Sequence, residues 1–409
     1  MIKEEFEKNE KKKKKIKLEK ERGITLIALV ITIIILIILA TVTITLVFGE
    51  GGLIQRAQEG KELTEQAQKD EQDELKGAEE FINGVLAGTT NPPEESTPIE
   101  EAKPNPNEDG PKFEDTTTIT DDLDNEVTIP GGFHLDKDSG TKVEEGIVIE
   151  DDSGNQFVWV PVGEYNVSDT INSAGKLTNE LTRRIFTEEG STPVNGDDAI
   201  AGPNAETYNE YYYGEGDRRS VAYGEIDAFL ESAKPVSEGG HGGFYIGRYE
   251  QGEGNVCKAG VDAYGELTRD EAKEQAEAMY SSNGEIKATS QLISSYAWDT
   301  ALNFICQTNT EGYLLATTTD EAYGNIGTDN KTKTGEYEAD NYSNIHDLLG
   351  NCYEWTTEHS SRDYYSCVRS GGACGSSDYY AAFRYSNHTS YIYANNSFRL
   401  QLYVNPESW

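Results

Sequence analysis

The hydrophobic positions of the chain first form one long apolar run and then a helical stripe. Residues 24–48 carry no charge, and about 20 apolar residues are enough to cross a bilayer, so this run predicts a transmembrane helix. Residues 49–87 continue with helix formers, among which Leu75, Ala78 and Ile82 recur at spacings of three and four and predict a helical stalk. The stripe fits a plain amphipathic spacer as well as a surface that packs in a filament.

The pattern then changes twice more. Residues 88–124 hold six of the twelve prolines, between Pro92 and Pro111, and almost no large apolar residue before position 120. Such a segment cannot bury enough surface to offset its ordering entropy, which predicts a disordered acidic linker. Residues 125–409 contain short apolar runs bounded by Gly, Asp and Asn, which predict a globular domain with long insertions over 163–240.

Within this domain the short runs predict individual elements. A hairpin is expected where residues 147–149 and 156–162 flank an Asp-Asp-Ser-Gly-Asn turn. Another strand is expected at 243–250, and helices are expected at 268–281 and 296–307. The predicted fold class is therefore an irregular α+β domain with few long elements.

The net charge bears on the possible partners, and the cysteine content bears on zinc binding and disulfides. Lys plus Arg number 35 and Asp plus Glu number 73, for a net charge of −38, which excludes a nucleic-acid partner because phosphate binding needs a basic surface. The five cysteines form no Cys/His spacing suited to zinc, and their odd number leaves at least one thiol unpaired in a monomer. Their disulfide pairing cannot be assigned from the sequence.

The amino terminus predicts where the protein is placed. Residues 1–23 hold ten Lys or Arg and six acids, a net of +4, and such a basic flank stays cytoplasmic. The expected location is the cell membrane, crossed once, with the carboxyl-terminal domain outside the cell. A cleaved secretory signal is the rival interpretation, but its apolar core is usually about 7–15 residues long.

At the end of the basic flank, Gly23 is followed by Ile24 and by Thr25-Leu26-Ile27. In these residues the amino terminus resembles the type IV prepilin signal. The resemblance implies cleavage after Gly23, a mature terminus at Ile24 and pilus subunits as partners. The acidic residue usual at the fifth mature position is Ala28 here, which favours a minor pseudopilin or a membrane-anchored protein over a major pilin.

Within residues 128–405 the chain contains, in this order, the segments FVWVPV, FYIGRYE, YAWDTA, DLLGNCYEWT, RSGG and SFRL. In these segments the domain resembles the formylglycine-generating enzyme, or sulfatase-modifying factor, family. The resemblance implies a variant of the C-type-lectin fold. Two departures occur, since Ser370 directly precedes the glycine pair where the family has Arg, and Ser397 replaces the family's Gly before Phe398.

The same resemblance gives two expectations about metal binding, one for copper and one for calcium. Oxygen-dependent members bind copper through two cysteines, and Ser376 and Ala381 occupy the matching positions, so no copper and no catalysis are expected. The resemblance also implies a structural calcium site made of side-chain oxygens of Asp347 and Glu354 and main-chain oxygens of Gly350 and Cys352. The alternative is that both acids cap turns.

Residues 373–397 contain five Tyr, five Ser and three Asn, a mixture typical of antibody loops. Tyr gives large contact area at low entropic cost, and Ser and Asn give adaptable hydrogen bonds. The candidate ligand-binding residues are Tyr379, Tyr380, Tyr385, Asn387, His388, Tyr391, Tyr393 and Asn395. Tyr391 and Tyr393 alternate, so they share one face if their segment is a strand. The alternative is that these polar and aromatic residues cover a lectin-type surface without binding a ligand, with some of the tyrosines in the core.

The arrangement is also similar to the variable proteins of diversity-generating retroelements, in which substitutions gather before the terminal FRL-like strand. The sequence thus favours a membrane- or pilus-anchored surface protein with a non-enzymatic C-type-lectin-like domain that binds a protein or glycan on another surface. The alternatives are a formylglycine-generating-type or related metal-dependent oxidase and a structural minor pilin.

Overall fold

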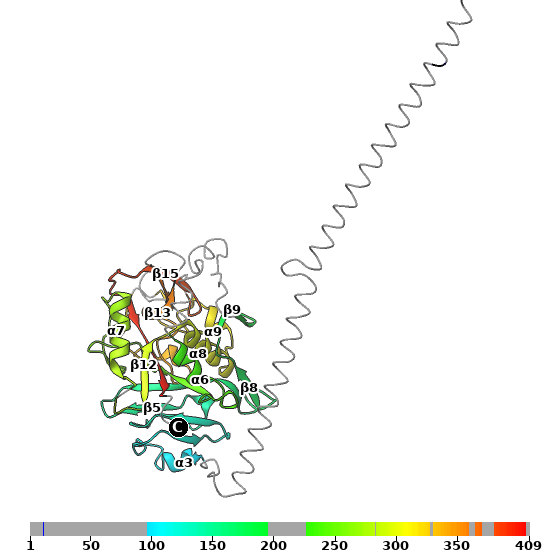
Figure 1. The fold of residues 1–409 in the computed structure, drawn as a ribbon, viewed down its shortest axis with the longest axis vertical. Helices are drawn as coiled ribbons and strands as arrows, with labels where there is room; N and C mark the ends of the chain where they lie inside the picture. The colour runs from blue at the N-terminus through cyan, green and yellow to red at the C-terminus, as the bar shows by residue number, and fades with distance from the viewer. Residues whose placement is uncertain are drawn as a thin grey trace, which may run out of the picture. The chain divides into compact units, whose positions relative to one another are not determined.

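The computed structural model describes residues 11, 96–194, 226–282, 284–327, 330–359, 365–369 and 380–405. The chain divides into two compact units, residues 1–94 and 95–409, and the fold below is that of the second unit (Figure 1). The predicted leader (1–23), transmembrane helix (24–48) and stalk (49–87) lie outside the described residues. Within the described ranges, no helix has the length and apolar character needed to cross a membrane.

The second unit combines short helices with many short strands, which confirms the predicted mixture of helix and sheet. Its strands are β1 (Thr97–Pro98), β2 (Thr117–Thr120), β3 (Glu126–Ile129), β4 (Phe133–Leu135), β5 (Val148–Asp151), β6 (Gln156–Pro161), β7 (Gly163–Asn166), β8 (Lys176–Asn179), β9 (Arg183–Thr187), β10 (Gly190–Val194), β11 (Gly243–Gly247), β12 (Ala288–Leu292), β13 (Tyr353–His359), β14 (Tyr365–Arg369), β15 (Arg384–His388), β16 (Asn396–Phe398) and β17 (Leu400–Val404). Its helices are α3 (Ile99–Ala102), α6 (Asp227–Ala233), α7 (Arg269–Met279), α8 (Ser295–Thr308) and α9 (Leu314–Thr317), with 3₁₀ turns η1 (Val143–Glu145), η2 (Val236–Glu238) and η3 (Glu338–Asp340).

A six-stranded antiparallel sheet forms the centre of the unit, in the order β12-β17-β11-β6-β5-β4. The predicted hairpin is its β5–β6 pair. Asp151 closes the turn, because its Oδ1 accepts hydrogen bonds from the amides of Ser153 (2.9 Å) and Asn155 (2.8 Å). The apolar run of β6 is buried from Phe157 onward, as expected for an internal strand.

Helices α7 and α8 match the predicted helices. Thr268 and Glu271 form a capping box at the start of α7, which fixes where that helix begins. Ser294 caps α8 by accepting a hydrogen bond from the Ala297 amide. Trp298, on the apolar face of α8, is fully buried.

The predicted disordered linker over 88–124 is wrong from residue 96 onward. Residues 97–102 form β1 and α3, and β2 pairs with both β1 and β3 in a three-stranded sheet. Ile99 and Ala102 are each 3% exposed and Ile119 is fully buried in the core. The folded unit therefore begins near residue 95 and not at 125. Few but well-placed apolar residues suffice here because the sheet supplies partners that composition does not reveal.

A four-stranded sheet in the order β15-β14-β13-β16 carries the carboxyl-terminal part of the chain. β13 pairs antiparallel with β14 and parallel with β16, with Trp355 opposite Phe398. Figure 1 shows β13 and β15 at the end of the unit opposite α3. Residues presented beyond β15 are thus far from the point at which the chain enters the folded unit.

Candidate ligand-binding site

The loop of residues 389–395, here called the display loop, connects β15 to β16. Neighbouring segments donate hydrogen bonds to four of its main-chain carbonyl groups. These carbonyls belong to Thr389 (from the Arg269 amide, 3.0 Å), Tyr393 (from the Glu266 amide, 3.1 Å), Ala394 (from the Lys331 ammonium, 3.0 Å) and Asn395 (from the Tyr353 amide, 2.9 Å). The position of the display loop is therefore set by its main chain.

Large apolar side chains are exposed on this loop. Within the described residues, those exposed are Ile185 (41%), Val236 (53%), Tyr385 (39%), Tyr391 (42%), Ile392 (59%) and Tyr393 (49%). Four of these six fall between positions 385 and 393. Burying such side chains against a partner is favourable, and a group of them marks an interaction surface.

Three side chains of the loop region form an ordered stack. The Tyr391 ring lies over the His388 ring at a centroid distance of 5.2 Å and an angle of 29°. The Tyr393 ring meets the Tyr391 ring edge-on at 5.4 Å and 81°. His388 is oriented by its Nδ1, which lies 2.8 Å from the Ser390 hydroxyl. We call His388, Tyr391, Ile392 and Tyr393 the aromatic patch.

Among the other predicted ligand-binding residues, Tyr385 is exposed, whereas Asn387, Tyr380 and Asn395 are at least partly buried. Asn387 is only 8% exposed, so its side chain does not contribute to the exposed surface. Tyr380 is half-buried against Phe383, at a centroid distance of 5.7 Å, and burial raises the pKa of its hydroxyl. Asn395 is half-buried and Tyr379 lies outside the described residues.

Tyr391 and Tyr393 were expected to share a face if their segment formed a strand. The segment is a loop, yet their rings are in contact. Ile392, the most exposed of the six apolar side chains, was missed because strand alternation would turn it to the opposite face. The run Tyr391-Ile392-Tyr393, apolar throughout in a polar segment, was the available signal.

A buried ionic cluster supports the sheet below this loop. Asp299 on α8 accepts hydrogen bonds from Arg369 on β14 (Nη2–Oδ1, 2.7 Å) and from Arg384 on β15. Burial alone would raise the pKa of Asp299, but the two guanidinium groups hold it below its usual value. Arg384 Nε also donates to Glu358 Oε2 on β13 (3.3 Å). The cluster thus ties β13, β14 and β15 to one helix.

The predicted calcium residues lie in a second buried region that is rich in acids. Arg399 donates to both oxygens of Glu354 (Nε, 3.1 Å to each; Nη2, 2.8 Å to Oε1). Both residues are fully buried. Because the guanidinium engages both carboxylate oxygens, Glu354 does not fit the role of a calcium ligand in this arrangement.

The other residues of the predicted calcium set are placed as follows. Asp347 accepts a hydrogen bond from the Gly335 amide through Oδ2 (2.8 Å), whereas its buried Oδ1 has no hydrogen-bond partner and is the atom that best fits a cation. The Cys352 amide donates to Glu250 Oε1 (2.7 Å), and Gly350 lies in the same turn. Burial raises the pKa of Asp347 to about 6, and that of neighbouring Asp340 to about 8.

The described cysteines are Cys257, Cys306, Cys352 and Cys367, all of them buried free thiols. Burial raises the pKa of each thiol, to about 11 for Cys257. Their thiolate forms, which bind soft metals and act as nucleophiles, are therefore disfavoured near neutral pH. Ala381, which the family resemblance aligned with a copper-binding cysteine, is buried, and its carbonyl accepts a hydrogen bond from Trp298 Nε1 (3.0 Å). Cys374 and Ser376 lie outside the described residues.

No protein-family model and no curated protein matches the chain. Among solved structures, it is similar to PvdO from Pseudomonas aeruginosa, with 11% identity and a TM-score of 0.32 over 63% of this chain and 98% of that one. It is also similar to variable protein 1 of Treponema denticola, with 12% identity and a TM-score of 0.27 over 62% of this chain and 96% of that one. Both TM-scores are too low to support an assignment of fold or function.

Proposed function

We propose that residues 95–409 form a non-enzymatic, C-type-lectin-like domain that binds a ligand through the aromatic patch. The observation that carries the proposal is the gathering of four of the six exposed large apolar side chains between positions 385 and 393. Tyr391 and Tyr393 offer rigid amphipathic rings, and Ser390 and His388 offer hydrogen bonds beside them. This combination suits a protein or a glycan on another surface.

The placement of the patch supports a role in display. β15 and the sheet to which it belongs lie at the end of the folded unit opposite α3, where the described chain begins (Figure 1). We propose that the apolar run at 24–48 anchors the protein in the cell membrane, or in a pilus after cleavage between Gly23 and Ile24. The domain would then stand outside the cell, where the aromatic patch is available to a partner.

The rival functions have less support. An oxidase of the formylglycine-generating type would need an accessible cysteine pair, whereas the described thiols are buried and their pKa values are raised. A purely structural minor pilin leaves the exposed aromatic patch without a role. Calcium at Asp347, Gly350, Cys352 and Glu354 stays a prediction, which the binding of Glu354 to Arg399 does not favour.

Glycan and protein arrays probed with the full-length chain test the proposal. The wild-type protein is expected to bind defined members of the array. The double variant Tyr391→Ala/Tyr393→Ala is expected not to bind them. The double variant Ile185→Ala/Val236→Ala removes exposed apolar surface outside the patch and is the matched control. Binding of the same array members by both double variants, or the absence of any binding by the wild-type protein, would reject the aromatic patch as the binding surface.

A further inference from the structure

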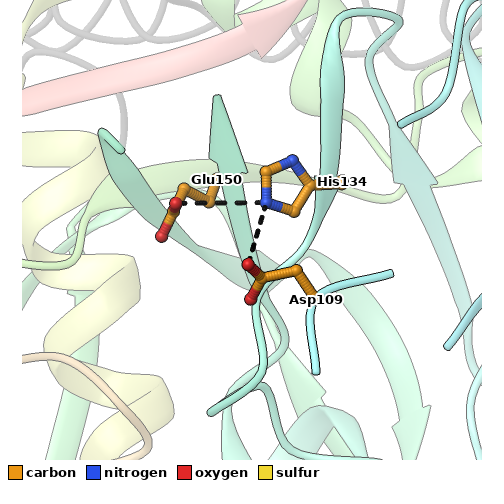
Figure 2. A group of neighbouring side chains, drawn as sticks. All are labelled: Asp109, His134 and Glu150. Carbon is orange, nitrogen blue, oxygen red and sulfur yellow. Dashed lines mark ion pairs between the residues drawn. The ribbon is translucent and has the colours of Figure 1, made fainter. Parts of the chain in front are cut away.

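Three potential metal ligands meet at the edge of the six-stranded sheet, away from the aromatic patch. His134 on β4 and Glu150 on β5 are directly opposite each other in the antiparallel register. His134 Nε2 lies 4.0 Å from Glu150 Oε1 and 4.0 Å from Asp109 Oδ2 (Figure 2). The three ligand atoms all lie within 4.8 Å of one another.

In both Asp109 and Glu150, one carboxylate oxygen accepts a hydrogen bond and the second oxygen faces the His134 imidazole. Asp109 Oδ1 accepts a hydrogen bond from the Lys137 amide (2.9 Å), and Glu150 Oε2 accepts one from Gln156 Nε2 (2.6 Å). Figure 2 shows both remaining oxygens facing His134 Nε2. Such hydrogen bonds to the outer oxygen are what orient the carboxylate ligands of metal sites.

The imidazole nitrogen at the centre of this group lacks a hydrogen-bond partner. His134 Nε2 is buried, and no donor or acceptor lies within hydrogen-bonding distance of it. A buried polar atom without a partner costs about 1–3 kcal/mol, so native structures usually supply one.

We propose that Asp109, His134 and Glu150 bind one divalent first-row transition-metal ion, of the class represented by zinc. One imidazole with two carboxylates suits such an ion, whereas calcium takes oxygen ligands only. Ligands about 2.1 Å from a tetrahedral ion are about 3.4 Å apart. The 4.0 Å separations from His134 Nε2 would therefore need to shorten by about 0.6 Å. Asp109, whose side chain is 49% exposed, has room for that movement.

The ion would fasten the first segment of the folded unit to the edge of the sheet. Asp109 belongs to the stretch between α3 and β2. Two main-chain hydrogen bonds already join this stretch to β4. The amide of Gly110 donates to the Leu135 carbonyl (2.8 Å), and that of Phe113 donates to the Phe133 carbonyl (2.8 Å). A metal bridge from this stretch to β4 and β5 would stiffen the place where the chain enters the folded unit. This role does not depend on the proposed ligand-binding function.

Titration of the metal-free full-length protein with zinc chloride, followed by calorimetry and by metal analysis after dialysis, tests the proposal. The expected result is one bound equivalent, with affinity at least 10-fold lower in His134→Gln and in Asp109→Asn. Asp152→Asn is the matched control, since Asp152 lies near the same edge but pairs with Lys112 (2.8 Å), and it should bind zinc like the wild type. Circular dichroism in metal-free buffer checks that each variant is folded, and half-exposed Asp109 is the substitution least able to disturb the fold.

Cobalt gives a second readout that separates this site from cysteine binding. The Co²⁺-loaded protein should show d–d absorption without thiolate-to-cobalt charge transfer, and the d–d bands should disappear in His134→Gln. The proposal is overturned by a thiolate charge-transfer band, by the absence of zinc binding, or by unchanged affinity in both His134→Gln and Asp109→Asn.

Discussion

Arg399 binds both carboxylate oxygens of Glu354, and neither side chain is exposed to solvent. The guanidinium also donates to the main-chain carbonyls of Gly247 (2.8 Å) and His346 (2.9 Å). One side chain thereby joins β11, the loop before β13 and β13 itself. This buried ion pair is therefore a suitable target for a stability test.

Replacing Arg399 with Gln should lower the free energy of unfolding by about 3–5 kcal/mol, because it leaves the Glu354 carboxylate buried without a counter-charge. Urea unfolding at neutral pH measures the change. The double variant Glu354→Leu/Arg399→Met removes both charges and should recover part of the loss. A loss below about 1 kcal/mol in Arg399→Gln would contradict the structural role assigned to the pair.

Replacing Asp299 with Asn should also destabilise the fold by about 3 kcal/mol or more, because Arg369 and Arg384 would both lose their shared carboxylate in a buried setting. The control is Glu164→Gln, since Glu164 forms an exposed pair with Lys176 whose loss should cost less than about 1 kcal/mol. Thermal unfolding of both variants gives the comparison. Equal losses of stability in the two variants would show that burial of the Asp299 ion pairs does not increase their contribution to stability.

Tyr391→Ala and Tyr393→Ala should each weaken binding to an array member retained by the wild type by about 10-fold or more, as exposed aromatic anchors do. Because the two rings touch edge-on, their effects should not be additive, with a coupling of about 0.5–1.5 kcal/mol in a double-mutant cycle. The unfolding free energy should change by less than about 0.5 kcal/mol. Strictly additive losses would speak against a joint contact with the ligand.

His241 should contribute to acid unfolding. Burial lowers its pKa to about 4, below the value of about 6.5 expected for an unfolded chain. Between these values the unfolded state binds one proton more, so stability falls as the pH drops, by at most about 1.4 kcal/mol per pH unit. His241→Gln should flatten the pH dependence of the unfolding free energy over this range. An identical slope in the variant would contradict the assignment.

Calcium should leave the melting temperature unchanged relative to a chelator, because Arg399 already occupies both oxygens of Glu354. Scanning calorimetry in millimolar calcium and in excess chelator makes the comparison. A rise with calcium that disappears in Asp347→Asn would instead support the site implied by the family resemblance, since Asp347 Oδ1 lacks a hydrogen-bond partner.

The parts of the fold that local sequence determines were predictable. The cap of α7 at Thr268 and the turn of the β5–β6 hairpin both depend on residues adjacent in sequence. The parallel pairing of β13 with β16 was not predictable, because its partners are some forty residues apart and each strand is short. The burial of Ile99 and Ala102 was hidden for the same reason, since their partners lie elsewhere in the chain.

The candidate site was predictable in composition and less so in detail. The Tyr- and Ser-rich run correctly indicated where exposed aromatic side chains gather. Alternation along a strand was the wrong rule for the display loop, so Ile392 was missed. Asn387 was included although its side chain is buried. The set Asp109, His134 and Glu150 left no sequence signal, because strand register and a segment taken for a linker bring it together.

The four hydrogen bonds that fix the display loop all end on carbonyl oxygens, at Thr389, Tyr393, Ala394 and Asn395. Every one of the twenty amino acids has that carbonyl, so these anchors do not depend on which side chains the loop carries. Substitutions among these seven residues therefore leave the hydrogen bonds that position the loop in place, so its exposed side chains can change while the scaffold beneath it stays the same.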